Sequence, residues 1–361
     1  MKDLIYDVWL STLPGFSAGT KLKMMDVFSG CRGVFEAPET VLKEEFSRRG
    51  ILSPATNACR KLLQKDMARA QYCLKQAKKI GAHVISIRSQ EYPAQLKTIA
   101  DPPLVLFALG DVSLLQSRCV AVVGTRRASP YGRWAAAEIA KRVSLAGVTV
   151  VSGMAEGIDS AAHTGCLQAG GKTIAVFGTG VDVCFPKSNI HLYSEIREKG
   201  LLLSEYCFGE GGYAYNFPER NRIISGLSES CIVAEGAVKS GSLITAGLAA
   251  EQGRNVFALP GNINQPGSAG TNLLISEGVP PINSMEHLLQ TLGIASAAIE
   301  HRADLSPQEK QLMRFIAACG SSSRQFILEN CGLPFGQSGP LLTCLELKGF
   351  VKLEGSQVFT L

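Results

Sequence analysis

The sequence predicts an α/β protein: a Rossmann-like doubly wound parallel sheet with a helical N-terminal domain and a C-terminal winged helix. Seven short apolar runs recur between residues 83 and 259, and most are followed by a glycine and a helical segment. Strands that are apolar throughout and alternate with helices are typical of a parallel sheet covered on both faces. The 361 residues, 46% of them hydrophobic, suit two or three domains with buried cores. We expect domains at residues 1–80, 81–290 and 304–361.

The N-terminal segment has a helical pattern with short breaks and a basic charge. It holds 14 Lys and Arg against 8 Asp and Glu, a net +6, which suits a polyanionic partner as well as an ordinary solvated surface. The run LPGFSAGTKLKMMDVF, residues 13–28, resembles a helix-hairpin-helix (SAM-like) element, whose hairpin amides contact DNA phosphates. Ser17 stands where that hairpin usually has a second glycine, and a plain helical connector fits the run equally well.

The seven apolar runs are the expected strands of the central sheet. They cover residues 83–87, 120–123, 148–151, 173–177, 201–204, 231–234 and 255–259. Ligands of doubly wound sheets bind at the carboxyl ends of the strands. The turns GTRRASPYG, SGMAEGID and EGAVKSGS each follow one of these runs, so we expect the binding site to be built from them.

Two dense polar clusters flank the strand at residues 231–234. A helix starting near Ser242 would point its first N–H groups at the turn that carries Lys239, which makes an anion site. The alternative is that Ser240 or Ser242 only caps the helix and Lys239 is solvated. The candidate ligands are Asn216, Arg220, Asn221 and Arg222 before the strand, and Lys239, Ser240, Gly241, Ser242 and Thr245 after it.

The turn after residues 120–123 lacks the signature of a nucleotide site. It reads Gly124, Thr125, Arg126, so a bulky cation replaces the glycine that lets a backbone approach a pyrophosphate, and the chain has no Walker A motif. We expect no cofactor, and neither NAD nor ATP bound tightly. A loop position favours a site role for Arg126 over a mere surface charge. Three further candidates in the neighbouring turns are Ser129, Ser152 and Gly153.

Cysteine and histidine patterns indicate neither a metal site nor catalysis. The 11 cysteines are odd in number and never spaced C-x-x-C, so we expect neither zinc nor a disulfide framework, but buried cysteines in a reducing compartment. Asp159 and His163, one helical turn apart, suit a structural role better than a catalytic one, because no nucleophile lies nearby in the sequence. No apolar run reaches the roughly 18 residues of a membrane span, and the N-terminus has no apolar leader, so we expect a cytoplasmic protein with no membrane partner.

The C-terminal segment predicts a winged helix after an alanine-rich connector near residues 293–298. Helical patterns at residues 306–318, 324–329 and 338–347 precede two β-like runs around Glu354 and Gly355. Winged helices commonly bind duplex DNA. Residues 291–361 carry six basic and six acidic side chains, so a protein-contact or regulatory role is at least as well supported.

A series of motifs carries a family resemblance over residues 83–283. YPAQLKTIADPP, VVGTRRASPYG, SGMAEGIDSAAH, KTIAVFGTGVDVCFP, LLLSEY, NFPERNRIISGLS, VAEGAVKSGSLITA and ALPGN follow in the order and spacing of the bacterial DNA-processing protein A (DprA/Smf) family. The resemblance implies a non-enzymatic protein of competence that binds and protects incoming single-stranded DNA and loads the RecA recombinase on it in natural transformation. It also implies a homodimer formed through the Rossmann-like domain.

The resemblance assigns DNA contacts to specific positions. Cations would neutralise phosphates, and Phe217 would stack on a base; a core role for the Phe217 ring is equally compatible with its sequence context. The residues implied are Arg126, Asn216, Phe217, Arg220, Arg222, Lys239, Ser240, Gly241 and Ser242.

Two other functions remain open at the level of sequence. One is a transcriptional regulator that reads duplex DNA through the winged helix, with the sheet as a sensor. The other is a nucleotide-cleaving enzyme of the phosphoribohydrolase kind, whose PGGxGTxxE motif carries a catalytic glutamate. Here Leu248 holds the place of that glutamate and Glu251 comes three residues later, so the enzyme reading has little support.

Overall fold

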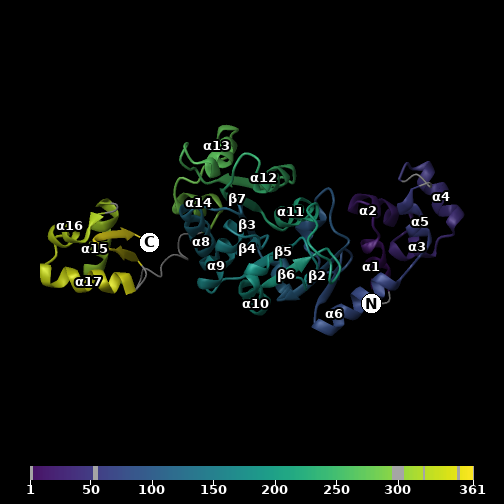
Figure 1. The fold of residues 1–361 in the computed structure, drawn as a ribbon, viewed down its shortest axis with the longest axis horizontal. Coiled ribbons are helices and arrows are strands. Elements are labelled where there is room, and N and C mark those ends of the chain that lie inside the picture. The colour runs from purple at the N-terminus through teal and green to yellow at the C-terminus, as the bar shows by residue number, and fades with distance from the viewer. Residues whose placement is uncertain (1–2, 52–55, 295–304, 320–321, 348–349, 361) are drawn as a thin grey trace. The chain divides into compact units, whose positions relative to one another are not determined.

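The computed structural model describes residues 3–51, 56–294, 305–319, 322–347 and 350–360 (Figure 1). The chain forms two compact units, Met1–Ser296 and Ala297–Leu361. The boundary expected between residues 80 and 81 lies inside the first unit, in the turn between α6 (Ala68–Ile80) and β1 (His83–Ser86). Part of the alanine-rich connector lies outside the described residues.

The first unit is built on an eight-stranded sheet with the order β1-β2-β6-β5-β4-β3-β7-β8. Strands β3 to β8 pair in parallel, which confirms the predicted fold class. The remaining strands are β2 (Val105–Gly110), β3 (Cys119–Gly124), β4 (Thr149–Ser152), β5 (Thr173–Phe177), β6 (Leu201–Ser204), β7 (Ser230–Glu235) and β8 (Asn255–Ala258).

One edge of the sheet differs from the expectation. We expected residues 83–87 to join a wholly parallel sheet, but β1 pairs antiparallel with β2, and β2 pairs antiparallel with β6. The strand β2 was missed because the run LVLFALG lacks the following helix that marks the other strands. The parallel part of the sheet, which carries the predicted site, is unaffected.

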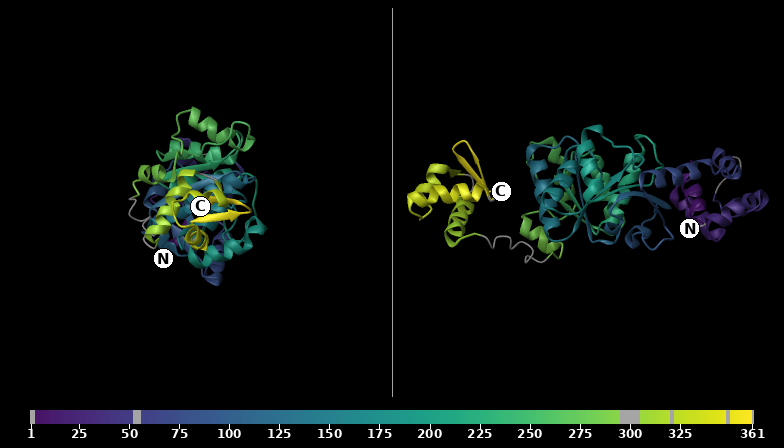
Figure 2. Two further views of the ribbon diagram at one scale, coloured as in Figure 1. Left: turned by 90° about the vertical axis from the view of Figure 1, so that its left-hand side faces the viewer. Right: turned by 90° about the horizontal axis from the view of Figure 1, so that it is seen from below.

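Helices cover both faces of the parallel strands (Figure 2). On one face lie α8 (Pro130–Leu145), α9 (Ile158–Gln168) and α10 (Ile190–Lys199); on the other lie α7 (Ala94–Lys97), α11 (Asn216–Leu227) and α12 (Gly241–Glu251). Side chains of α11 and α12 pack with those of β3 and β5 in one buried core. After β8 come α13 (Ala269–Ser276) and α14 (Met285–Thr291). This core holds the first turns of α11 and α12 against the carboxyl ends of the strands.

The N-terminal helices share a core with the sheet. Trp9 and Phe46 belong to the same buried cluster as Phe107 and Phe177 of the sheet. The helices are α1 (Leu4–Thr12), α2 (Ala18–Val27), α3 (Cys31–Glu36), α4 (Glu39–Arg48), α5 (Asn57–Leu63) and α6. In the helix-hairpin-helix-like run at residues 13–28, the amide of Gly19 at the start of α2 donates to the carboxylate of Asp101. That amide therefore has an anionic partner within its own chain.

A disulfide joins the N-terminal helices to the sheet. Cys73 on α6 is bonded to Cys207 in the segment after β6, with the two Cα atoms 6.1 Å apart. This corrects the expectation that the cysteines are all unbridged core residues. The pair lies 134 positions apart in sequence, so its spacing gave no signal.

The described residues of the second unit form three helices and a small sheet of order β10-β11-β9. Leu312, Ile327 and Val358 lie in its buried core. The predicted order of helices and terminal strands is present, and a winged helix remains our interpretation of it. The elements are α15 (Pro307–Cys319), β9 (Ser322–Ser323), α16 (Arg324–Asn330), α17 (Phe335–Leu347), β10 (Val351–Glu354) and β11 (Gln357–Thr360).

No described helix is both long and apolar enough to span a bilayer. Within the described ranges, no group of three or more His, Cys, Asp or Glu side chains is arranged to hold a metal ion.

Candidate nucleic-acid interface

A crevice of about 410 Å³ opens where the carboxyl ends of the central strands meet the first turns of α11 and α12. We call it the basic crevice. Ten of the sixteen candidate residues line it, at the strand ends where doubly wound sheets hold their ligands, and its role as the binding site stays a prediction. They are Gly124, Thr125, Arg126, Phe217, Arg220, Asn221, Ser240, Gly241, Ser242 and Thr245.

Three exposed cations lie in or next to the crevice. Arg126 and Arg127 in the turn after β3 are exposed, as is Lys239 next to Ser240. None of the three forms an ion pair with a carboxylate in the described part of the chain. The Arg126 guanidinium lies 5.4 Å from the centroid of the half-buried Phe217 ring, a cation–π distance. Positive charge and an aromatic face therefore lie side by side.

The N-terminus of α12 adds hydroxyls and a helix dipole. Ser240 caps this 11-residue helix by accepting from the Ser242 amide, and the two hydroxyl oxygens lie 2.8 Å apart. A Cβ atom on Gly241 would meet nothing within 4 Å, so this residue faces open space. Helix N-termini with free donors bind anions, and here an exposed lysine stands beside one. The Ser240 cap and the exposed Lys239 fit both interpretations of KSGS, an anion site and a plain helix cap, and the anion site stays a prediction.

Arg220 is a buried residue that lines the crevice and is bonded to the backbone of two strand ends. Its Nη1 atom donates to the carbonyls of Gly153 (2.8 Å) and Val176, at the ends of β4 and β5. Burial lowers the pKa of Arg220 to about 10, although Asp159 acts in the opposite direction. A Cβ on Gly153 would lie 2.6 Å from the Arg220 guanidinium, so a larger residue there would displace that side chain. Arg220 thus ties strand ends together while one side of it lines the crevice.

Asp159 and His163 are also structural, as expected. The Asp159 carboxylate accepts from the amides of Gly153 (3.1 Å) and Ala155 (3.3 Å), and burial raises its pKa. His163 Nδ1 lies 2.7 Å from the Thr173 hydroxyl, and burial lowers the pKa of the imidazole to about 3. A neutral imidazole in the core fits packing rather than proton transfer.

Arg222 lies in a different cavity. Its guanidinium makes two bonds to the Glu205 carboxylate, at 2.6 and 2.7 Å, and one to the Asp101 carbonyl at 2.9 Å. Its side chain is 12% exposed. Burial would lower the pKa of Arg222, but Glu205 and Asp101 raise it above the ordinary value. Because its donors are already taken, the expected phosphate contact of Arg222 does not fit this geometry.

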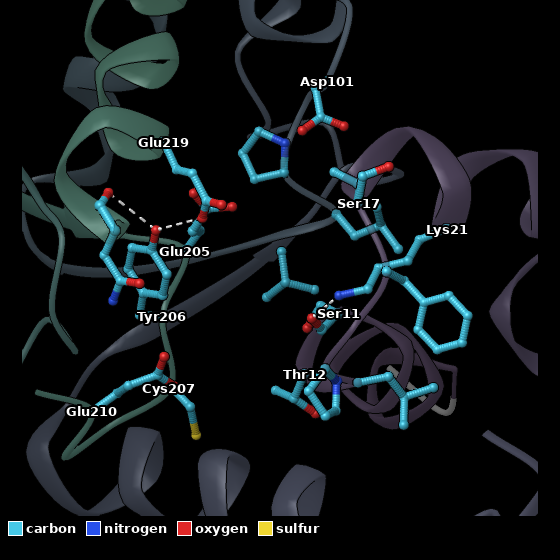
Figure 3. Close-up of a pocket in the computed structure, with 18 of the residues that line it drawn as sticks. Ser11, Thr12, Ser17, Lys21, Asp101, Glu205, Tyr206, Cys207, Glu210 and Glu219 are labelled. Atoms are coloured by element: carbon cyan, nitrogen blue, oxygen red, sulfur yellow. Dashed lines mark hydrogen bonds between the residues drawn. The ribbon is translucent and has the colours of Figure 1, made fainter. Parts of the chain in front are cut away.

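That second cavity, of about 720 Å³, lies between the α1–α2 turn and the segment after β6 (Figure 3). We call it the ion-paired cavity, because its cations have partners in the chain. Arg69 bonds to Glu210 at 2.5 Å, and Lys21 donates to the Ser11 carbonyl at 2.5 Å. Burial lowers the pKa of Lys21 to about 8, with the Glu205 and Asp101 carboxylates opposing that shift.

The other candidates outside the crevice lining have structural partners or lie next to a lining residue. The Ser129 hydroxyl donates to Glu235 at 2.8 Å and caps α8, and that of the fully buried Ser152 donates to the Val122 carbonyl. The Asn216 amide donates to the Gly178 carbonyl at 2.9 Å. Lys239 is exposed and directly precedes the lining residue Ser240.

Sequence reasoning missed several residues around the crevice. Arg127 lines it and could have been named, because it follows Arg126 directly. The Phe185 ring lies 5.2 Å from the Phe217 ring, yet 32 positions separate them. Exposed rings at Tyr213 and Tyr215 precede α11, and nothing in a glycine-rich stretch signals their exposure.

Comparisons with known proteins agree with the fold and the motifs. The family model for DNA recombination-mediator protein A matches residues 83–293. DNA processing protein DprA of Bacillus subtilis is 43% identical over 213 residues, which are 59% of this chain and 72% of that protein. The crystal structure of DNA processing protein A from Streptococcus pneumoniae superimposes with a TM-score of 0.68 at 36% identity, covering 79% of this chain and 97% of that one.

A further solved structure concerns the single-stranded DNA binding mode of DNA processing protein A from Helicobacter pylori. It matches with a TM-score of 0.54 at 31% identity, over 58% of this chain and 95% of that one. The family model spans more than half of the sequence, and the resemblance seen in the motifs is confirmed. The chain belongs to the DNA recombination-mediator protein A (DprA/Smf) family.

Proposed function

We propose that this protein binds single-stranded DNA in the basic crevice. The observation that carries the proposal is that Arg126 and Arg127 line the crevice together with the Phe217 ring and the N-terminus of α12, where the exposed Lys239 precedes Ser240. None of these three cations has a carboxylate partner among the described residues. Cations that track a backbone next to an aromatic platform are the usual means of holding single strands without regard to sequence. The related H. pylori protein is described as binding single-stranded DNA.

The shape of the crevice favours an unpaired strand over a duplex. Phe217 is half buried at the wall of a cavity of about 410 Å³, so a base must leave its stack to reach the ring. Unstacking is least costly in a strand that is already single. Phosphates would then lie against Arg126, Lys239 and the first turn of α12, with one base on Phe217.

An enzymatic role finds no support in the crevice geometry. Among the described residues that line the crevice, Asp159 is the one carboxylate, and two backbone amides already hold it. Glu251 is the last residue of α12, about 15 Å along the helix from Gly241. The chain is therefore proposed to act by binding, and, by its family, to protect incoming DNA and load the RecA recombinase as a homodimer.

Titration with three ligands over a salt series tests this proposal. Single-stranded oligonucleotides should bind more tightly than duplex of the same length or mononucleotides, with log affinity falling in log salt by about 0.7 per phosphate neutralised. A preference for duplex would favour the regulator that acts through the C-terminal unit. Tight binding of a mononucleotide with its cleavage would favour the phosphoribohydrolase reading.

Gly241→Ala tests the location without changing any charge. The added methyl meets no protein atom within 4 Å, so folding should be unaffected, but it occupies space at the N-terminus of α12. Single-strand affinity should fall several-fold, as judged by fluorescence anisotropy. Gly247→Ala, on the same helix and equally free of contacts but outside the crevice lining, is the matched control and should leave affinity unchanged.

A further inference from the structure

Two tyrosines beside the basic crevice are exposed and stacked on each other. Tyr213 is 54% exposed and Tyr215 is 63% exposed, and their ring centroids lie 5.6 Å apart with planes inclined by only 5°. The rings lie parallel in one exposed pair, and more than half of each residue is accessible to solvent. Large apolar rings exposed together usually mark a binding surface.

The segment that carries these rings divides the two cavities. Ala214 and Phe217 line the basic crevice, whereas Tyr213 and Tyr215 line the ion-paired cavity on the other side. Phe217 is anchored, because Gly178 and Gly212 pack close to its ring. Two peptide units separate Tyr215 from Phe217, so their Cα atoms are at most about 7.6 Å apart. Neighbouring nucleotides of one strand can span such a distance.

We propose that Tyr213 and Tyr215 form a second stacking platform, which holds a base of the same single strand just beyond the base on Phe217. This inference rests on the proposed single-strand binding in the basic crevice. Two exposed parallel rings offer a flat aromatic surface to the face of any base, and stacking of this kind is indifferent to sequence.

Charge indicates that this platform takes bases and not phosphates. The cavity on the tyrosine side is lined by four carboxylates against three cations, so its balance is negative, and Arg69 and Arg222 are already paired with Glu210 and Glu205. The carboxylates are those of Asp101, Glu205, Glu210 and Glu219, and the third cation is Lys21. A phosphate would be repelled on that side, whereas the free cations lie across the dividing segment in the basic crevice. The single-stranded DNA would therefore keep its phosphates in the basic crevice and place one base against Tyr213 and Tyr215.

The test combines tyrosine variants with a length series of oligothymidylates. Between about 4 and 16 nucleotides, the range that single-strand modules cover, the wild type should gain affinity at a length where the Tyr213→Ala/Tyr215→Ala protein does not. Beyond that length the double variant should bind roughly 5- to 100-fold more weakly, with an unchanged salt slope. Tyr213→Phe/Tyr215→Phe keeps both rings and should bind like the wild type. Phe326→Ala removes an exposed ring from the C-terminal unit and is the matched control.

A scan with abasic sites along a long oligonucleotide identifies which base stacks on the tyrosines. In the wild type, one abasic position should weaken binding through Phe217 and another through the tyrosines; the double variant should be insensitive at the second position only. Equal affinity of wild type and double variant at every length and abasic position, while Lys239→Ala still weakens binding, overturns the platform and leaves the crevice intact. A double variant that loses only the binding of a protein partner also overturns it. If Lys239→Ala and Phe217→Ala have no effect either, the proposed function itself fails.

Discussion

The basic crevice and the ion-paired cavity both contain cationic side chains, but those at the crevice are exposed and those in the cavity have partners in the chain. Arg126, Arg127 and Lys239 at the crevice are exposed and have no carboxylate partner within the described chain. Arg222 in the cavity is nearly enclosed and doubly bonded to Glu205. A cation that is already paired and desolvated stabilises the fold, whereas an unpaired cation is available to a ligand. Counting basic residues in a motif cannot distinguish structural cations from cations that bind a ligand.

The first prediction concerns the largest effect, the loss of a largely enclosed ion pair. Arg222→Ala would leave the Glu205 carboxylate, which is 17% exposed, without its guanidinium partner, so the free energy of unfolding should fall by about 3 kcal/mol, the lower end of the range for a buried pair. Urea denaturation followed by circular dichroism measures it. Arg126→Ala, an exposed control, should stay within about 0.5 kcal/mol of the wild type. If Arg222→Ala unfolds like the wild type but binds DNA with a shallower salt slope, Arg222 belongs with the crevice cations after all.

The second prediction uses the buried amine of the same cavity. The pKa of Lys21 is lowered from 10.5 to about 8. Between these values the unfolded chain holds a proton that the folded chain has released, so stability should rise with pH across this window, by up to about 3 kcal/mol. Below pH 8 both states are protonated, and the folded state bears the cost of a buried charge.

Lys21→Met keeps the apolar stem and removes the titration. The difference in unfolding free energy between wild type and Lys21→Met, measured in urea from pH 7.5 to 10.5, should shift in favour of the wild type as pH rises. A difference that stays constant over this range would mean that the amine is not held at a lowered pKa.

The contrast between the two cavities also shows what the sequence could predict. The crevice was predictable because a general rule places ligands at strand ends and because KSGS brings a lysine, hydroxyls and a helix start into one short segment. Ten of the sixteen candidates accordingly line it. Arg222 was misjudged because its partners Glu205 and Asp101 lie 17 and 121 positions away, and only the tertiary structure brings them together.

The other misses have the same origin. The antiparallel pairing of β2 with β1 and with β6 depends on how the chain returns to the sheet edge, which an apolar run does not specify. The Cys73–Cys207 bridge joins residues 134 positions apart. Local sequence patterns predicted the strands, the helices and the KSGS segment, which neighbouring residues determine. They did not predict strand pairing, the disulfide or the ion pairs, which depend on contacts between distant residues.

The third prediction returns to the crevice and its aromatic wall. Phe217→Ala should weaken single-strand binding by roughly 1 to 3 kcal/mol if the ring stacks on a base, and the salt slope should not change, because no charge is removed. Fluorescence anisotropy at several salt concentrations measures both quantities. Phe217→Tyr keeps a ring and serves as the control. A change in slope would show that the main effect of the ring is to position the Arg126 guanidinium, which lies over it.

The last prediction concerns the unpaired cations themselves, where the effect is smallest per residue but most specific. Arg126→Ala and Lys239→Ala should each make the dependence of log affinity on log salt shallower by about 0.7, and the double variant by about 1.4, for every base sequence alike. Stability should change by less than about 0.5 kcal/mol, because neither side chain is enclosed.

Lys199→Ala is the matched control for this experiment, since Lys199 is exposed but paired with Glu195 at 2.8 Å, on α10 and outside the crevice lining. It should leave the slope unchanged. If the control lowers the slope as much as Arg126→Ala does, the protein attracts DNA through its general positive charge and the crevice has no special role. If only Arg126 and Lys239 matter, the absence of an internal partner is what distinguishes a binding cation from a structural one in this fold.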